Sequence, residues 1–217
     1  MVDEIKKTAR EHLATDGANL SLRAVARDLG MVSSAVYRYF DSRDALLTAL
    51  IIDAYNDLGD AVERAESPVP RKNLARRWTA LATAVRDWAV ANQPEYALLY
   101  GSPVPGYRAP QDTIEPASRP VLVFARIVAD AVAAGATIEG TSARLPKAVR
   151  ADLAKLRGQP GFGGIAEPVF AKLILVWAQL FGLISFELFG RLVGSVDDND
   201  AFFAYFVRTV ATEFGLS

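Results

Sequence analysis

The chain has 217 residues, with 24 Lys and Arg, 25 Asp and Glu, a single His and no Cys. The absence of Cys excludes disulfides, thiolate metal sites and Cys nucleophiles, and one His cannot build a site that needs two imidazoles. A net charge of −1 excludes a polycation that coats nucleic acid through bulk charge, so DNA binding would need a local patch. We therefore expect a globular chain with no metal site and no cofactor.

No targeting segment is expected. The first seven residues become amphipathic at once and contain no apolar signal-peptide core. The longest nearly apolar stretch, residues 173–186, has 14 residues and includes Gln179, which is short of the roughly 18–20 needed to cross a bilayer. We expect a cytoplasmic protein in which this stretch is a buried helix.

Apolar residues recur at helical spacing along almost the whole chain, and no segment has the convincing alternation of a strand. The predicted helices cover about residues 3–16, 21–29, 33–40, 41–66, 74–88, 94–100, 113–134, 146–156, 167–190 and 199–214. Gly17 is expected to end the first helix. The expected fold is therefore all-α: a three-helix N-terminal domain over residues 1–45, joined to an antiparallel helical bundle over residues 46–217.

The second and third predicted helices are short and are joined by a turn. Ser21 is a candidate N-cap of the first, and Gly30 can adopt the left-handed conformation that the tight turn requires. In the second, Val36 and Phe40 form an apolar face. This arrangement is that of a helix-turn-helix, whose second helix is short enough to enter a DNA major groove.

The polar side chains of that second helix are suited to DNA. Hydroxyl and guanidinium donors that fit phosphates and base edges lie away from its apolar face, on Ser33, Ser34, Tyr37 and Arg38. Residues 21–43 contain four Arg and two Asp, a local surplus of positive charge. The alternative is that Tyr37 and Tyr39 are half-buried packing residues of an ordinary three-helix domain.

Residues 5–50 resemble the N-terminal domain of the TetR family of bacterial transcription regulators. The matching stretch, residues 22–46, reads LRAVARDLGMVSSAVYRYFDSRDAL, and it agrees in spacing as well as in residue types. The resemblance implies a regulator, usually a repressor, that binds a palindromic operator as a homodimer. It also implies release of the operator when a small molecule enters the C-terminal domain.

The same resemblance implies which residues contact DNA. The candidate DNA-binding residues are Arg23, Ser33, Ser34, Tyr37, Arg38, Tyr39 and Arg43. Of these, Tyr37, Tyr39 and Arg43 are expected on phosphates, whereas the two serines and Arg38 are expected near base edges. Family members often have Thr where this chain has Ala35, so one hydroxyl contact is expected to be absent.

The C-terminal half resembles the regulatory-domain subfamily named for a Trp-His-Gly motif. Trp177 and Gly182 match that motif, and residues 92–110 look like the subfamily's earlier helix and loop. Phe181 stands where the subfamily has His. Because a phenyl ring neither titrates nor donates a hydrogen bond, a polar role at this position is not expected.

The predicted helix over residues 167–190 is apolar around most of its circumference and therefore needs partners on both sides. The last helix has an apolar stripe with Phe202 and Tyr205 left over. Two such helices from each subunit can form a four-helix dimer interface. The expected interface residues are Val169, Val176, Leu180, Leu183, Phe203, Val207 and Val210. A monomer whose long loops cover these faces is the alternative.

Aromatic residues gather in the regulatory part of the chain, and an aromatic-lined cavity suits an apolar or aromatic small molecule. The candidate lining residues are Trp78, Trp88, Tyr96, Tyr100, Tyr107, Phe124, Trp177 and Phe181. Plain core packing is the alternative for each of them, and Trp88 could equally face the N-terminal domain.

An enzyme is not expected, and no catalytic residue is predicted. The chain lacks a nucleophile elbow, a phosphate-binding loop and a dinucleotide-binding unit. His12 follows Glu11, but adjacent residues of a helix do not face each other and form no dyad. The alternative function is a small-molecule sensor or adaptor of the same fold without operator binding.

Overall fold

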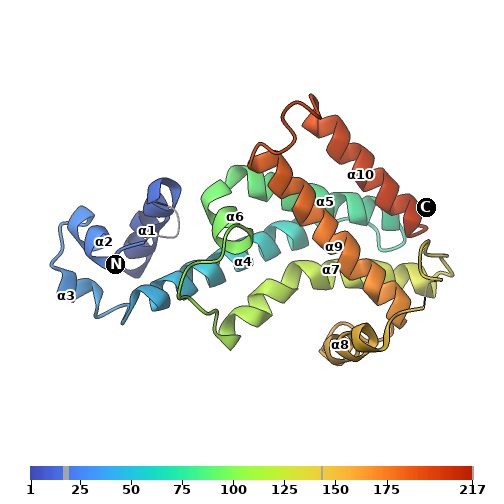
Figure 1. Cartoon of the computed structure of the whole chain (residues 1–217), viewed down its shortest axis with the longest axis horizontal. Coiled ribbons are helices and arrows are strands. Elements are labelled where there is room, and N and C mark those ends of the chain that lie inside the picture. The colour runs from blue at the N-terminus through green and yellow to red at the C-terminus, as the bar shows by residue number, and fades with distance from the viewer. Residues whose placement is uncertain (17–19, 143, 217) are drawn as a thin grey trace. The chain divides into compact units, whose positions relative to one another are not determined.

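The computed structural model describes residues 1–16, 20–142 and 144–216, and these ranges contain helices and no strand (Figure 1). The helices are α1 (Val2–Asp16), α2 (Leu22–Asp28), α3 (Ser33–Val36), α4 (Arg43–Glu66), α5 (Leu74–Ala91), α6 (Gln93–Tyr100), the 3₁₀ turn η1 (Gln111–Thr113), α7 (Ile114–Ala133), α8 (Lys147–Arg157), α9 (Glu167–Leu188) and α10 (Asn199–Glu213). The predicted all-α fold is confirmed. Gly17, which was expected to end the first helix, lies outside the described residues.

The helix-turn-helix forms through the local signals that predicted it. The hydroxyl of Ser21 accepts a hydrogen bond from the backbone N–H of Ala24 and caps α2, and Gly30 takes a φ of +65° in the turn. α3 is shorter than predicted, with one regular turn. Hydrogen-bonded turns follow α3 as far as Phe40. The next helix, α4, begins soon afterwards, and the hydroxyl of Ser42 caps it by accepting a hydrogen bond from the N–H of Ala45 at 3.1 Å.

The described chain packs as two compact units. Unit 1 consists of residues 1–59 and 88–118, and unit 2 consists of residues 60–87 and 119–217. Helices α4, α5 and α7 each contribute residues to both units. The sequence predicted a domain boundary at residue 45, after the helix-turn-helix. In the structure, the helix-turn-helix packs in one unit with residues 88–118.

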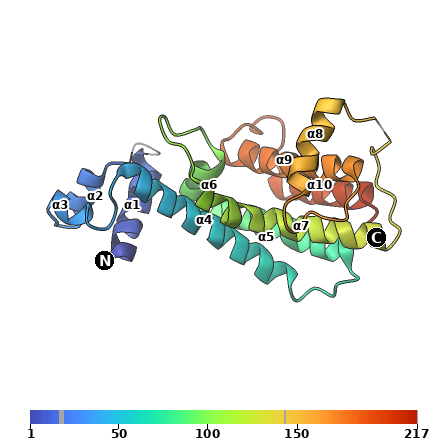
Figure 2. The ribbon, with the colours of Figure 1, turned by 90° about the horizontal axis from the view of Figure 1, so that it is seen from below.

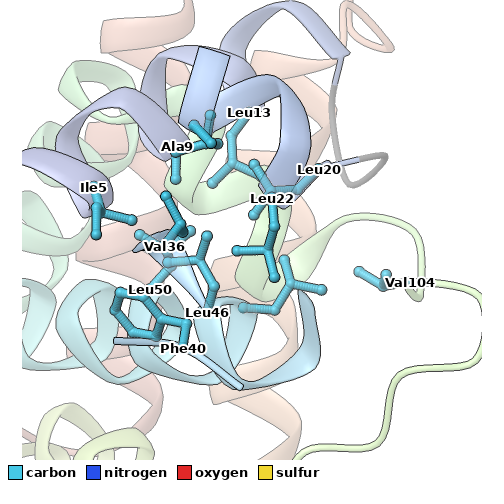
Figure 3. Close-up of a cluster of buried hydrophobic side chains, with 13 residues drawn as sticks. Ile5, Ala9, Leu13, Leu20, Leu22, Val36, Phe40, Leu46, Leu50 and Val104 are labelled. Atoms are coloured by element: carbon cyan, nitrogen blue, oxygen red, sulfur yellow. The ribbon is translucent and has the colours of Figure 1, made fainter. Parts of the chain in front are cut away.

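The core of unit 1 encloses the apolar face of α3, as the sequence predicted, with Val36 and Phe40 buried. Figure 3 shows this cluster, whose members are Ile5, Ala9, Leu13, Leu20, Leu22, Val25, Ala26, Val36, Phe40, Leu46, Leu47, Leu50 and Val104. Val104 was not predicted to belong to this core, and it comes from the loop after α6, far along the chain from the other members. Tyr107 of the same loop packs against the cluster, and its hydroxyl lies 2.9 Å from that of Thr48 in α4.

Charged side chains hold α6 and α4 against α1 in unit 1. Lys6 and Arg10 of α1 both donate to the carboxylate of Asp53 in α4, each at 2.9 Å. Arg10 also lies 3.9 Å from Glu95 of α6. Residues 93–107 are therefore attached to the N-terminal helices by apolar packing and by charge.

The core of unit 2 is built around Trp78 of α5. Its indole N–H donates to the backbone carbonyl of Val207 in α10 at 2.9 Å, and its ring lies 4.7 Å from that of Phe124 in α7. On another face of α5, Arg86 donates to both carboxylate oxygens of Glu187 in α9, at 2.6 and 2.8 Å. Figure 2 shows α9 with α8 and α10 packed against it.

Helix α9 buries only one side within the subunit. The buried side carries Phe170, Leu173, Val176, Leu180, Phe181 and Ile184. The other side exposes the apolar side chains Leu175, Phe186 and Phe189. By length and composition alone, the 22 residues of α9 could cross a membrane, which the stretch counted over residues 173–186 did not indicate; the core helix of a soluble protein passes the same test. A third (33%) of its most apolar window is buried in the subunit, and the expectation of a buried helix holds for one face only.

We predict that Val104→Ala lowers the free energy of unfolding of unit 1 by about 1–2 kcal/mol, because it leaves a small void in the core around α3. Hydrogen exchange of the amides of α1 and α2, read by mass spectrometry, should become faster. Val193→Ala is the matched control, since that valine is 83% exposed. Unchanged exchange in α1 and α2 of the Val104 variant would show that the loop does not support this core.

Candidate functional site

The face of α3 opposite the core presents hydroxyls and a guanidinium to solvent. Tyr37 is 43% exposed and Tyr39 is 45% exposed, while Ser34 and Arg38 are also exposed and Ser33 is half-buried. Within the described ranges, the hydroxyls of Tyr37 and Tyr39 form no hydrogen bond with the protein. Their hydroxyls are therefore available to an outside partner, while the covered half of each side chain is compatible with the packing alternative.

The two arginines that flank this face are placed differently from each other. Arg23 of α2 is exposed. Arg43 is half-buried, and its Nε donates to the backbone carbonyl of Leu20 at 3.1 Å. Arg43 thus fastens the segment before α2 to the start of α4, a positioning role that the sequence did not predict. The side chain of Arg43 is still partly exposed, and its Nη1 lies 3.8 Å from the carboxylate of Asp44.

Asp28 is the acidic side chain at the end of α2, and it is paired within the protein. Its carboxylate lies 2.7 Å from Nε2 of His12 in α1 and 3.5 Å from Nε of Arg27. The hydrogen bond with His12 holds the pKa of the Asp28 carboxyl below its usual value. His12, which the sequence left without a partner, therefore joins α1 to α2.

Half of the aromatic side chains predicted to line a ligand cavity form a cluster in unit 2. They are Trp78, Phe124, Trp177 and Phe181. The Phe124 and Trp177 rings are 6.3 Å apart, and the Trp177 and Phe181 rings are 5.0 Å apart. Trp78 and Phe124 are fully buried, whereas Trp177 is half-buried. Trp177 is therefore the most exposed member of this cluster.

The other half belongs to unit 1, namely Trp88, Tyr96, Tyr100 and Tyr107. The rings of Tyr96 and Tyr100 lie 5.2 Å apart, and that of Tyr55 lies 6.2 Å from Tyr100. Burial raises the pKa of both Tyr55 and Tyr100, so their hydroxyls stay protonated at neutral pH. The eight predicted residues are thus divided between two units.

A surface groove of about 440 Å³ runs between α9 and α10. Its lining residues are Gln179, Gly182, Leu183, Phe186, Phe202, Tyr205, Phe206, Thr209, Val210 and Glu213. The lining is mostly apolar, and Phe186 (54% exposed) and Tyr205 (59% exposed) stand out from it. Large exposed apolar patches are often interaction sites, which makes this groove a candidate binding surface.

The residues predicted for a dimer interface only partly coincide with this groove. Leu183 and Val210 line it, while Val169 is half-buried at the start of α9 and does not. Four others are instead buried in the subunit's own core: Val176, Leu180, Phe203 and Val207. Apolar residues surround α9 on all sides, so their spacing could not tell its inner face from its outer face. The sequence feature that could have indicated the groove is the pair Phe202 and Tyr205, which lie outside the regular apolar stripe of α10.

No group of three or more His, Cys, Asp or Glu side chains that could hold a metal ion occurs in the described part of the chain. The exposed surfaces described above carry hydroxyl and guanidinium groups within and just after α3, and apolar side chains between α9 and α10.

Comparison with known proteins agrees with this arrangement. The sequence model described as "Bacterial regulatory proteins, tetR family" matches residues 5–50, and that described as "Tetracyclin repressor-like, C-terminal domain" matches residues 78–210. The chain is 47% identical over 190 residues to the HTH-type transcriptional regulators Rv1816 of Mycobacterium tuberculosis and Mb1846 of Mycobacterium bovis. These alignments cover 87% of this chain and 80% of each relative.

Solved structures show the same fold over nearly the whole chain. The candidate regulatory protein SCO4313 is 32% identical and superposes with a TM-score of 0.77, covering 97% of this chain and 95% of that one. A bacterial regulatory protein in the tetR family from Rhodococcus RHA1 is 17% identical, with a TM-score of 0.66 over 100% of this chain and 97% of that one. The sequence matches at both ends of the chain and the 47% identity to the mycobacterial regulators establish that this protein belongs to the TetR family of helix-turn-helix transcription regulators, which are DNA-binding regulators and not enzymes.

Proposed function

We propose that this TetR-family regulator is a repressor that binds a palindromic operator as a homodimer and is released by a small apolar or aromatic effector. The exposed face of α3 carries this proposal. Its donors are held on a rigid base, because Val36 and Phe40 are buried directly behind them. A regulator of this class works on chromosomal DNA, and we accordingly place it in the cytoplasm.

The donors on this face suit two kinds of DNA contact. The hydroxyls of Tyr37 and Tyr39 extend from the end of α3 and fit phosphate oxygens, which position a protein without reading sequence. Arg43 is a third phosphate contact in this proposal. Ser33, Ser34 and Arg38 lie within or just after α3, where side chains reach base edges in a major groove, and Arg23 supports them from α2.

One copy of so short a helix contacts too few bases to select a site in a genome. Two copies held about 34–36 Å apart read two half-sites in successive major grooves. The groove between α9 and α10 supports pairing of two subunits, since a twofold interface uses the same self-complementary surface twice. Pairing there also covers the outer apolar face of α9 with protein, so that this face needs no contact with a membrane.

The effector is proposed to bind in unit 2, beside the half-buried Trp177. The polar atom of the neighbouring Trp78 indole is already bonded to the backbone of Val207, so the aromatic cluster offers an apolar environment to a ligand. A ligand can shift an equilibrium only if it binds one conformation better than another. Residues 93–107, which follow α5 and join the core behind α3, provide a covalent and packed route by which that preference reaches DNA binding.

The DNA-binding face is tested with two variants. Duplexes selected from a random library by the wild-type protein should contain a palindrome, and affinity for them should fall steeply with salt as counterions are released. Tyr37→Ala should weaken binding to all sequence variants of the site alike. Arg38→Ala should relax the preference at one or two base pairs by about 1–3 kcal/mol, measured by fluorescence anisotropy.

Lys147→Ala is the control for the DNA experiment, since it also removes one positive charge but lies in α8. It should bind the selected site like the wild type. Equal effects of the Tyr37 and Arg38 variants on every sequence would contradict the roles assigned to them. Failure to enrich any palindrome would favour a sensor or adaptor that does not bind an operator.

Pairing through the groove is tested by placing a charge in it. Tyr205→Asp should weaken dimerisation roughly a hundredfold, because an aromatic side chain at an interface is replaced by a buried, unpaired carboxylate. Sedimentation velocity across a range of protein concentrations measures this shift. Val149→Asp, in the half-exposed face of α8, should leave the dimer intact. A wild-type protein that stays monomeric at micromolar concentration would refute the proposal.

The effector site is tested by affinity selection from a library of aromatic small molecules, followed by mass spectrometry. Compounds retained by the wild type should be lost with Trp177→Leu, which keeps an apolar side chain but removes the indole. The retained compounds should also release the selected operator duplex. Compounds that bind both proteins equally, or that bind without releasing DNA, would show that this cluster is not the effector site.

A further inference from the structure

A second, polar pocket lies in unit 2 and shares no lining residue with the aromatic cluster or with the α9–α10 groove. It has a volume of about 240 Å³ and forms where α4 ends, beside the first turn of α5 and the C-terminal half of α7. Its polar lining consists of Glu66, Ser67, Arg71, Arg77, Arg126 and Asp130. Three guanidinium groups therefore share this pocket with two carboxylates, which leaves a surplus of one positive charge.

Both carboxylates are already neutralised by arginine. Asp130 accepts hydrogen bonds from Nη2 of Arg71 at 2.7 Å and from Nη1 of Arg77 at 2.6 Å. Glu66 accepts from Nε of Arg77 at 2.5 Å. The hydrogen bond from Arg71, and then that from Arg77, lowers the pKa of the Asp130 carboxyl, so this carboxyl stays ionised at neutral pH. The positive charge of Arg126 is the one that these two carboxylates leave uncompensated.

Several donors around the pocket have no acceptor. Arg77 is only 5% exposed, and its Nη1 is used by Asp130 and by the backbone carbonyl of Arg71. Across residues 1–16, 20–142 and 144–216, its Nη2 donates to no protein atom, and neither the guanidinium of Arg126 nor the hydroxyl of Ser67 has a side-chain partner. Arg126 and Ser67 are exposed and Nη2 of Arg77 is open to solvent, so an anion that enters the pocket can reach all three donors, and a negatively charged acceptor is favoured by the surplus positive charge.

We propose that this pocket binds a small oxyanion, a phosphate or carboxylate group, with Arg126 supplying the main charge and Nη2 of Arg77 and the hydroxyl of Ser67 donating hydrogen bonds. A planar guanidinium fits both oxyanions through paired N–H groups. The surplus charge disfavours a cation. A bound oxyanion joins the end of α4 to α5 and α7 and so tightens this end of unit 2. The proposal does not depend on DNA binding or on the effector site.

The test is titration of the full-length protein with inorganic phosphate, followed by ³¹P NMR line broadening and by isothermal calorimetry. Sodium acetate forms a second arm, which distinguishes a tetrahedral oxyanion from a carboxylate. Sodium chloride at equal ionic strength corrects for general screening. Saturable binding of one phosphate or acetate per subunit is expected, and Arg126→Ala should weaken it roughly tenfold or more, since charge-assisted hydrogen bonds are lost.

Lys72→Ala is the matched control because Lys72 is an exposed cation of the same α4–α5 connection that does not line the pocket. It should bind phosphate like the wild type. Arg126 takes part in no ion pair of the network, so its variant should unfold at the wild-type midpoint when no oxyanion is present. Ser67→Ala should weaken binding by a smaller factor. Equal responses of the wild type and Arg126→Ala, or a phosphate response no larger than that of chloride, would overturn the proposal.

Discussion

The burial of the apolar face of α3 is the constraint on which the rest of the molecule depends. Val36 and Phe40 pack into a core that draws side chains from α1, α2 and α4, and Val104 of the loop after α6 completes it. That loop is also fixed by the hydroxyl contact of Tyr107 with Thr48. The DNA-binding face is therefore supported by a segment that sequence position alone would assign to the regulatory part.

Most of the fold could be predicted from the sequence because its helices are amphipathic and are bounded by local signals. Ser21 and Gly30 act as the cap and the turn that their residue types predicted. The inner and outer faces of α3 were also predicted, since its polar and apolar residues separate clearly. Here the local preference and the tertiary environment agree, as they do in sequences that specify one structure.

The remaining features could not be predicted because they depend on tertiary packing. Val104 is a single apolar residue among prolines and glycines, so no periodicity marks it as part of a core. In α9 the apolar pattern is continuous around the helix, and only the fold decides that Val176 faces inward while Phe186 faces outward. The polar pocket at the end of α4 joins residues more than fifty positions apart, and nothing in the spacing of Arg77 and Asp130 indicates that they meet.

The exposed apolar side of α9 affects how a newly made subunit is handled by chaperones and proteases in the cell. A newly synthesised subunit whose α9 is not covered by another chain exposes a long hydrophobic surface of the kind that chaperones and proteases recognise. If subunits pair through this side of α9, as proposed, those that fail to assemble should therefore be cleared rather than accumulate.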